Sequence, residues 1–271
     1  MNSILPVIRY VIRNKLTFIF VLLGLVIFLF IVVPLAKMLL SSVAEPVIFW
    51  KTILDGEVAG AIWLTLYTAL IATVVGFIFG IPLAYFLARH EFFGKKLVEG
   101  LIDVPIVVPH TAAGIALLFV FGRSFAVGRA FDSIGISFVD STAGIVIAML
   151  FVSVPFLIDS AKEGFKKVDV RLERVARTLG ASPWQVFTRI SFPLAWQSIV
   201  AGNIMMWARG ISEFGAVIIL AYHPMIAPIL LFERFEAFGL DHARPIAAIL
   251  IIVSVLIFVV LRMLVSRGQR A

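Results

Sequence analysis

Arg209 and Glu213 are charged residues four positions apart in an otherwise apolar stretch of the chain. This spacing places both side chains on one face of a helix, where they can form an ion pair. Ala208, Ser212 and Ala216 repeat every four residues beside them, and such a small-residue face permits close helix contact. Two interpretations remain open: a structural ion pair that fixes packing at a subunit interface, or charged groups that line a pathway.

A second group of polar residues, Asp103, His110 and Thr111, lies among apolar ones close to Pro105 and Pro109. Two prolines four residues apart remove two helix hydrogen bonds and kink or break the helix. Irregular backbone at membrane depth is tolerated only where it faces protein or a wet cavity. His110 and Thr111 could therefore donate hydrogen bonds to a passing anion, or serve in packing alone.

The composition predicts that these residues sit on membrane helices. Of 271 residues, 62% are hydrophobic and 14% are charged, with a mean hydropathy of +1.09. Soluble domains carry about 25% charged residues, so an integral membrane protein is expected. The absence of cysteine excludes disulfides, thiolate metal sites and a cysteine nucleophile. No cofactor is expected.

The apolar runs predict an all-α polytopic protein, because a span needs roughly 20 apolar residues. Six spans are expected, at about 17–39, 59–88, 99–121, 143–161, 196–222 and 245–265. The first is too long for the apolar part of a signal peptide. Residues 1–16 are then a cytoplasmic N-terminal segment, and 17–271 form a single transmembrane domain.

The distribution of basic residues predicts the orientation. With the N-terminus in the cytoplasm, most of the 23 Lys and Arg residues fall in inside segments, as the positive-inside rule requires. Both termini are therefore expected in the cytoplasm. The net charge of +7 follows from topology, and no nucleic-acid partner is expected.

The largest inside loop, about 162–195, has the pattern of two short helices. Asp169 can cap a helix that begins at Val170. Five apolar residues continue along one helical face: Phe165, Val168, Leu172, Val175 and Leu179. Gly180 suits the position after the helix, where a positive φ is needed.

The second helix of the loop is expected at about 183–189. Ser182, Pro183 and Gln185 have the spacing of a capping box with proline at the first helical position. Trp184 and Phe187 lie one turn apart, and Pro193 is expected to end the motif. Helices this short are unstable alone in water, so they pack either against their own membrane domain or in a groove of a cytoplasmic partner.

The loop resembles the cytoplasmic Glu-Ala-Ala loop of membrane permeases in ATP-binding-cassette importers. The core of that loop is Gly, nine residues, Ile, one residue, then Leu-Pro. Gly180, Ile190, Phe192 and Pro193 fill these places, with Phe192 in place of Leu.

The Glu-Ala-Ala triplet itself falls on Arg174, Val175 and Ala176, so the acidic lead residue is basic here and Glu173 stands one position earlier. The resemblance implies that this loop couples the permease to its ATPase. The residues it places in the coupling role are Glu173, Arg174, Ala176, Gly180, Ser182, Pro183, Trp184, Phe187, Ile190 and Pro193.

Four segments resemble molybdate/tungstate permeases more narrowly, with sulfate permeases as relatives: 103–118, 168–183, 207–217 and 222–235. The resemblance covers a permease core of about 57–265. It implies a type I importer permease fold in the plasma membrane and a homodimer. It also implies cytoplasmic ATPase subunits and an extracytoplasmic oxyanion-binding protein. Sulfate remains an alternative substrate to molybdate or tungstate.

The chain contains no GxxxxGK[ST] phosphate loop, so ATP hydrolysis is expected in a separate chain and this subunit is expected to be non-catalytic. A secondary transporter with Glu213 as proton relay is an alternative, but the loop has no role in it. An intramembrane enzyme is another, although HExxH and GxSxG motifs are absent.

Overall fold

A computed structural model describes residues 14–267, except for the side chains of 260–262 and 264–267. Residues 1–13 of the expected N-terminal segment lie outside the described part, and α2 already begins at Lys15. The helices are α2 (Lys15–Val43), α3 (Pro46–Ile53), α4 (Gly56–Arg89), α5 (Lys95–Val107), α6 (His110–Phe121), α7 (Ala126–Asp132), α8 (Thr142–Lys167), α9 (Val170–Thr178), α10 (Pro183–Val186), the π-helix η1 (Phe187–Ser191), α11 (Phe192–Ile211), α12 (Gly215–Leu220), α13 (Ala227–Phe238) and α14 (Leu240–Arg267).

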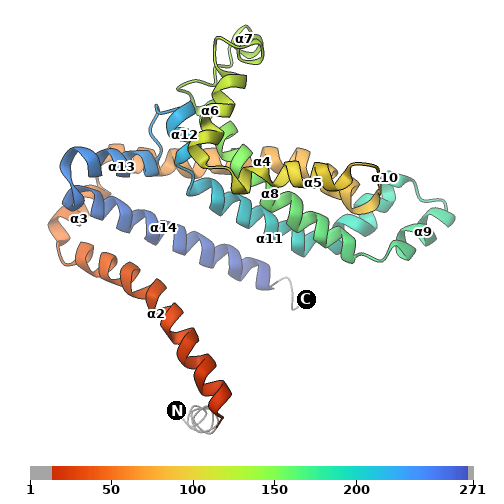
Figure 1. Ribbon diagram of the computed structural model, residues 1–271, viewed down its shortest axis with the longest axis horizontal. Helices are drawn as coiled ribbons and strands as arrows, with labels where there is room; N and C mark the ends of the chain where they lie inside the picture. Colours follow the sequence, from red (N-terminus) through yellow and green to blue (C-terminus); the bar gives the residue numbers. More distant parts are fainter. Residues whose placement is uncertain (1–13, 268–271) are drawn as a thin grey trace.

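Helix α8 is the centre of the bundle, because α4 and α11 both pack along it (Figure 1). Its buried side chains include Ile145, Met149, Leu157 and Phe165. Phe165 and Leu157 join a cluster with α4 and α11 near the α9 end, whereas Ile145 and Met149 join α4, α6 and α12. The α4–α8–α11 core therefore positions every polar site described below.

Four described helices are long and apolar enough to cross a membrane, or up to five if the bent pair α5–α6 counts as one span. They match the spans expected at 17–39, 59–88, 143–161 and 245–265. Helix α11 is also 20 residues long, but Gln197, Asn203 and Arg209 interrupt its apolar surface and it falls outside this set. An all-helical membrane fold is confirmed, while the number of six spans stays a prediction.

The expected third span is broken where its prolines predicted. Helices α5 and α6 meet at an angle of 115°. Val108 is extended, with φ −68° and ψ 135°, a conformation that the following proline favours over the helical one. Pro109 then stands just before α6 and does not interrupt a helix.

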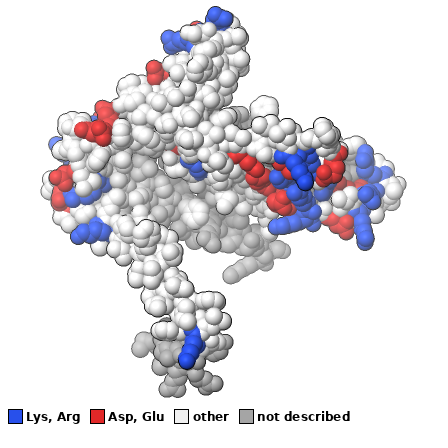
Figure 2. Space-filling view, viewed as in Figure 1, with Lys and Arg blue, Asp and Glu red and all other residues white. Residues whose placement is uncertain are grey.

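The two ends of the bundle differ in what they carry. Helices α9 and α10 lie at one end, and α3 and α13 lie at the other (Figure 1). Charged side chains gather at these two ends and at the tip formed by α7, and much of the surface between them is uncharged (Figure 2). Helix α2 projects away from the bundle with nearly all of its apolar side chains exposed. The sidedness of the chain stays a prediction.

Candidate functional site

The segment between α8 and α11 begins with α9, whose ends are fixed by local contacts. The Asp169 side chain accepts a hydrogen bond from the Arg171 amide at 2.9 Å. Gly180 has φ +88°, its amide donates to the Arg177 carbonyl, and the Ala181 amide donates to the Ala176 carbonyl. This pair of bonds is the Schellman motif, so both predicted ends of α9 are observed.

Helix α10 begins with the predicted capping box. The Ser182 side chain accepts from the Gln185 amide at 3.2 Å, and the Gln185 side chain accepts from the Ser182 amide at 2.8 Å. The expectation that the short helix stops near residue 189 and that Pro193 ends the motif before the fifth span is wrong. α10, η1 and α11 follow one another without a break from Pro183 to Ile211.

The π-turn explains why Pro193 is tolerated. Proline has no amide hydrogen to donate to the carbonyl four residues earlier. In η1, just before the proline, the Phe192 amide donates to the Phe187 carbonyl, which is five residues earlier and not four. This turn therefore contains one extra residue, and the helix continues past Pro193. Helix α10 is therefore the first turn of the long helix that contains Arg209.

The two aromatic side chains of this segment differ in exposure but stay in contact, with ring centroids 5.8 Å apart. Trp184 is 71% exposed. Phe187 is half-buried, and its ring lies 5.0 Å from that of Tyr85 and 6.1 Å from that of Phe165. The aromatic face predicted for Trp184 and Phe187 is therefore present, with Phe187 packed against the core and Trp184 open to a partner.

An apolar face of α9 is open as well. Leu172, Val175 and Leu179 are all exposed. Phe165 and Val168, which the sequence placed on the same face, are buried at the end of α8. The apolar part of the segment's outward surface thus includes one tryptophan and a short aliphatic stripe, among exposed basic side chains.

Glu173 anchors α9 to the membrane bundle. Its carboxylate oxygen Oε1 lies 2.7 Å from Arg89 Nη2 at the end of α4, and the two side chains are 10% and 8% exposed. The same oxygen accepts from the Ser191 hydroxyl at 2.7 Å. Arg89 also donates to the Val168 carbonyl at 3.2 Å. Sequence reasoning placed Glu173 in this loop but missed Arg89 and Ser191.

The remaining residues of the coupling set surround this anchor. Arg174 is exposed beside Glu173, so the basic residue at the place of the family's glutamate has no buried partner among the described residues. Ala176 and Ile190 are half-buried, and Pro183 and Pro193 are exposed.

A second polar site joins two broken helices. Glu213 follows α11, and its side chain is fully buried. Its Oε2 lies 2.8 Å from Arg209 Nη2 and 2.8 Å from His110 Nδ1, while its Oε1 accepts from the Ala216 amide at 2.8 Å. His110 is the first residue of α6, so the break between α5 and α6 lies against the break between α11 and α12.

His110 contacts both charged partners of the cluster. Arg209 Nη2 lies across the imidazole, 2.5 Å from Nδ1 and 2.9 Å from Nε2 of His110. Glu213 Oε2 lies 2.8 Å from Nδ1. The opposite charges of Arg209 and Glu213 offset each other within the cluster.

Close backbone approach makes the cluster possible. A Cβ at Gly215 would lie 2.7 Å from the Cβ of His110, so a side chain at Gly215 would push α6 away from α12. The structure thus brings Arg209, Glu213 and His110 together as a triad.

Two predicted pathway residues lie outside the triad. Thr111 is exposed beside His110, with no side-chain hydrogen bond among the described residues. Asp103 lies on the other side of the break, in α5, where Asp159, Lys162 and Glu99 are its charged neighbours. The sequence grouped Asp103 with His110 because both flank the prolines, and the 115° bend separates them.

The comparisons with known proteins agree with a polytopic permease. The family model described as binding-protein-dependent transport system inner membrane component matches residues 76–270. The chain therefore belongs to this family of transporter membrane components, and it is a multi-pass membrane protein. Members of the family are permease components of ATP-binding-cassette importers, as the resemblance of the loop predicted.

Several curated relatives match over nearly the whole chain. The molybdate/tungstate transport system permease protein WtpB of Thermococcus kodakarensis is 46% identical over 255 residues, which cover 94% of this chain and 98% of the relative. The protein of the same name from Methanocaldococcus jannaschii is 43% identical, with coverage of 88% and 92%. A probable sulfate transport system permease protein of Chlorokybus atmophyticus is 32% identical, with coverage of 82% and 79%.

Solved structures support the fold. A bacterial transporter that imports alginate has a chain with a TM-score of 0.76 at 17% identity, covering 97% of this chain and 99% of its own. A chain of the MetNI methionine transporter has a TM-score of 0.60 at 13% identity, with coverage of 79% and 94%. At these identities the likeness concerns the fold alone.

Proposed function

We propose that this chain is the membrane-spanning subunit of an ATP-driven importer of molybdate and tungstate. The observation that carries the proposal is the identity of 43–46%, over most of the chain, to permeases named for these two oxyanions. The chain itself lacks a phosphate-binding loop. The energy must then come from a separate ATPase subunit.

The surface proposed to receive that ATPase is formed by α9 and α10. Trp184, Leu172, Val175 and Leu179 are exposed there, on helices that Glu173 ties to α4. Short helices with an apolar face commonly dock in a groove of a partner. Because α10 continues into α11, a movement of the docked helix would be passed along α11 to the triad at its far end.

The triad is proposed to serve as a structural joint between the two broken helices. A bare arginine at this place would bind a dianion strongly and delay its release. Pairing with Glu213 cancels that charge and holds α6 against α12 through His110. Two copies of the chain would assemble as a homodimer that alternates between an outward-facing and an inward-facing state. The outward-facing state would receive the oxyanion from an extracytoplasmic binding protein. The joint would move as a unit during this change.

Removal of the exposed tryptophan tests the docking. Trp184→Ala should abolish the ATP hydrolysis that a molybdate-loaded binding protein stimulates in the assembled complex. Trp63→Ala is the matched control, because Trp63 is 70% exposed and Trp184 is 71% exposed, but Trp63 lies near the α3 end of α4. Normal stimulation in Trp184→Ala would refute docking at α10.

Sulfate is the second candidate substrate, because the relative from Chlorokybus atmophyticus is 32% identical over 82% of this chain. The assembled complex with its ATPase and binding protein distinguishes the two candidate substrates. Stimulation of ATP hydrolysis should be strong with molybdate or tungstate and weak with sulfate at equal concentration. The reverse order would assign the chain to sulfate import while leaving the ATPase coupling intact.

A further inference from the structure

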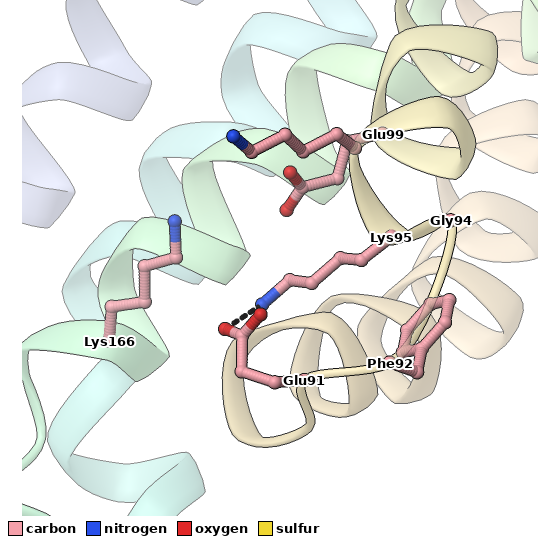
Figure 3. A pocket seen from close by; sticks show the side chains of 7 residues that line it. Glu91, Phe92, Gly94, Lys95, Glu99 and Lys166 are labelled. Carbon is pink, nitrogen blue, oxygen red and sulfur yellow. Dashed lines mark hydrogen bonds and ion pairs between the residues drawn. The ribbon is translucent and has the colours of Figure 1, made fainter.

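A hollow of about 460 Å³ lies between the α4–α5 turn and the end of α8. It opens at the same end of the bundle as α9 and α10, and Figure 3 shows Lys166 of α8 facing Lys95 and Glu91 of the turn. Its lining is dominated by charged side chains: Glu91, Phe92, Gly94, Lys95, Lys96, Glu99 and Lys166. Neither the triad nor the Glu173 anchor uses any of these residues.

The charges of the lining leave a small positive excess. The lining holds three lysines and two glutamates, which leave a net charge of +1. Lys95 Nζ lies 2.6 Å from Glu91 Oε1, and this hydrogen bond lowers the pKa of Glu91, so Glu91 stays charged. Glu99 faces Lys162 at 3.5 Å. Lys162 also pairs with Asp159, next to Asp103.

Two ammonium groups remain available to a ligand. Among the described residues, Lys166 forms an ion pair only with the exposed Glu163, at 2.9 Å, and an exposed pair of this kind contributes little to stability. Lys96 has no hydrogen-bond partner for its side chain among the described residues. It stands in the first turn of α5, and the N-terminal end of a helix favours negative charge.

An apolar surface runs directly away from the hollow. Phe93, Leu97, Leu101 and Val104 are all exposed, and their spacing of 4, 4 and 3 places them on one side of the turn and of α5. Within the described part of the chain, α8 is the long helix that packs along α5, on its other side. In a membrane permease, such a face contacts hydrocarbon.

We propose that this hollow binds the headgroup of an anionic membrane phospholipid, with the acyl chains along Leu97, Leu101 and Val104. Lys96 and Lys166 contact the phosphate. A phosphodiester carries a single negative charge, which matches the excess of +1, whereas the charge of a free dianion would exceed it. Basic pockets between membrane helices at the cytoplasmic surface are suited to such headgroups.

Lipid titration of the purified protein tests this assignment. Native mass spectrometry should show phosphatidylglycerol bound more tightly than phosphatidylcholine of the same chain length. Each lysine near a headgroup contributes about 1 kcal/mol, so the double variant Lys96→Gln, Lys166→Gln should weaken phosphatidylglycerol roughly thirtyfold. The control variant Lys37→Gln, Lys51→Gln removes two exposed lysines near α3 and should leave the affinity unchanged.

Three results would overturn the proposal. The first is equal affinity for the two lipids, and the second is unchanged binding of phosphatidylglycerol to the Lys96, Lys166 variant when its thermal unfolding is that of the wild type. The third is displacement of phosphatidylglycerol by millimolar inorganic phosphate, which would assign the hollow to a free anion. All three are independent of which oxyanion the chain transports.

Discussion

Replacement of Glu173 by methionine should release α9 from the membrane bundle. The variant leaves Arg89 with a buried charge, since its side chain is only 8% exposed, and leaves the Ser191 hydroxyl without its acceptor. Breaking a buried ion pair typically costs about 3–5 kcal/mol. The slight exposure of both partners places the expected cost near the lower value.

The loss of stability should open α9 and α10 before it affects the rest of the fold. Helix α9 has nine residues, too few to persist without tertiary contacts. A cost of about 3 kcal/mol raises the population of the open segment by roughly 100-fold. Local opening of this kind is visible in amide hydrogen exchange.

Hydrogen exchange over residues 168–191 is therefore the assay. Glu173→Met should accelerate exchange there and leave α8 unchanged, and the double variant Arg89→Met, Glu173→Met should restore most of the protection. Glu57→Met is the control, because Glu57 and Arg234 form an exposed pair at the other end of the bundle, worth about 0–1 kcal/mol. Wild-type protection in Glu173→Met, or no recovery in the double variant, would refute the anchor.

Three further outcomes are expected. Arg209→Met or Glu213→Met alone should lower thermal stability by about 3–5 kcal/mol, while the double Met variant recovers both stability and uptake; a double variant that is stable but does not transport would place Arg209 on the oxyanion path. A single cysteine introduced at Ala130 should be labelled by an impermeant reagent from outside, whereas one at Val175 should be labelled only from inside. External labelling at Val175 would contradict the predicted topology. Gly180→Ala should destabilise the α9–α10 turn by about 1–2 kcal/mol, because φ is +88° there. The control Gly100→Ala lies within α5 in open space and should not have this cost. Equal melting curves for the two variants would contradict the proposed backbone strain at position 180.

Local features of the coupling segment could be predicted from the sequence. The Asp169 cap, the Gly180 turn and the Ser182 capping box depend on residues within five positions of one another, and each is observed. The two prolines likewise predicted the break in the third span. Such features follow from backbone geometry, which short stretches of sequence determine.

Features that join distant parts of the chain could not be predicted in this way. Arg89 meets Glu173 across 84 positions, and His110 meets Glu213 across 103. Their pairing depends on how α4, α6 and α12 pack, and a single sequence contains no record of that packing. The pair Arg209–Glu213 was predicted because its partners lie one helical turn apart.

The role expected for Pro193 was wrong for a related reason. It depends on the π-turn η1, which adds a residue to the helix just before the proline. A proline after a short amphipathic helix ordinarily indicates a helix end. The continuity of α10 with α11 is visible only in the folded chain.

ATP-dependent uptake of tungstate measures the central proposal most directly. The chain would be reconstituted in vesicles with its ATPase and its binding protein, and accumulated tungsten would be counted with ATP supplied on the ATPase side. Uptake should require ATP and the binding protein, and should be competed by molybdate far better than by sulfate. Tungstate uptake that persists without the ATPase and follows a proton gradient would contradict an ATP-driven permease.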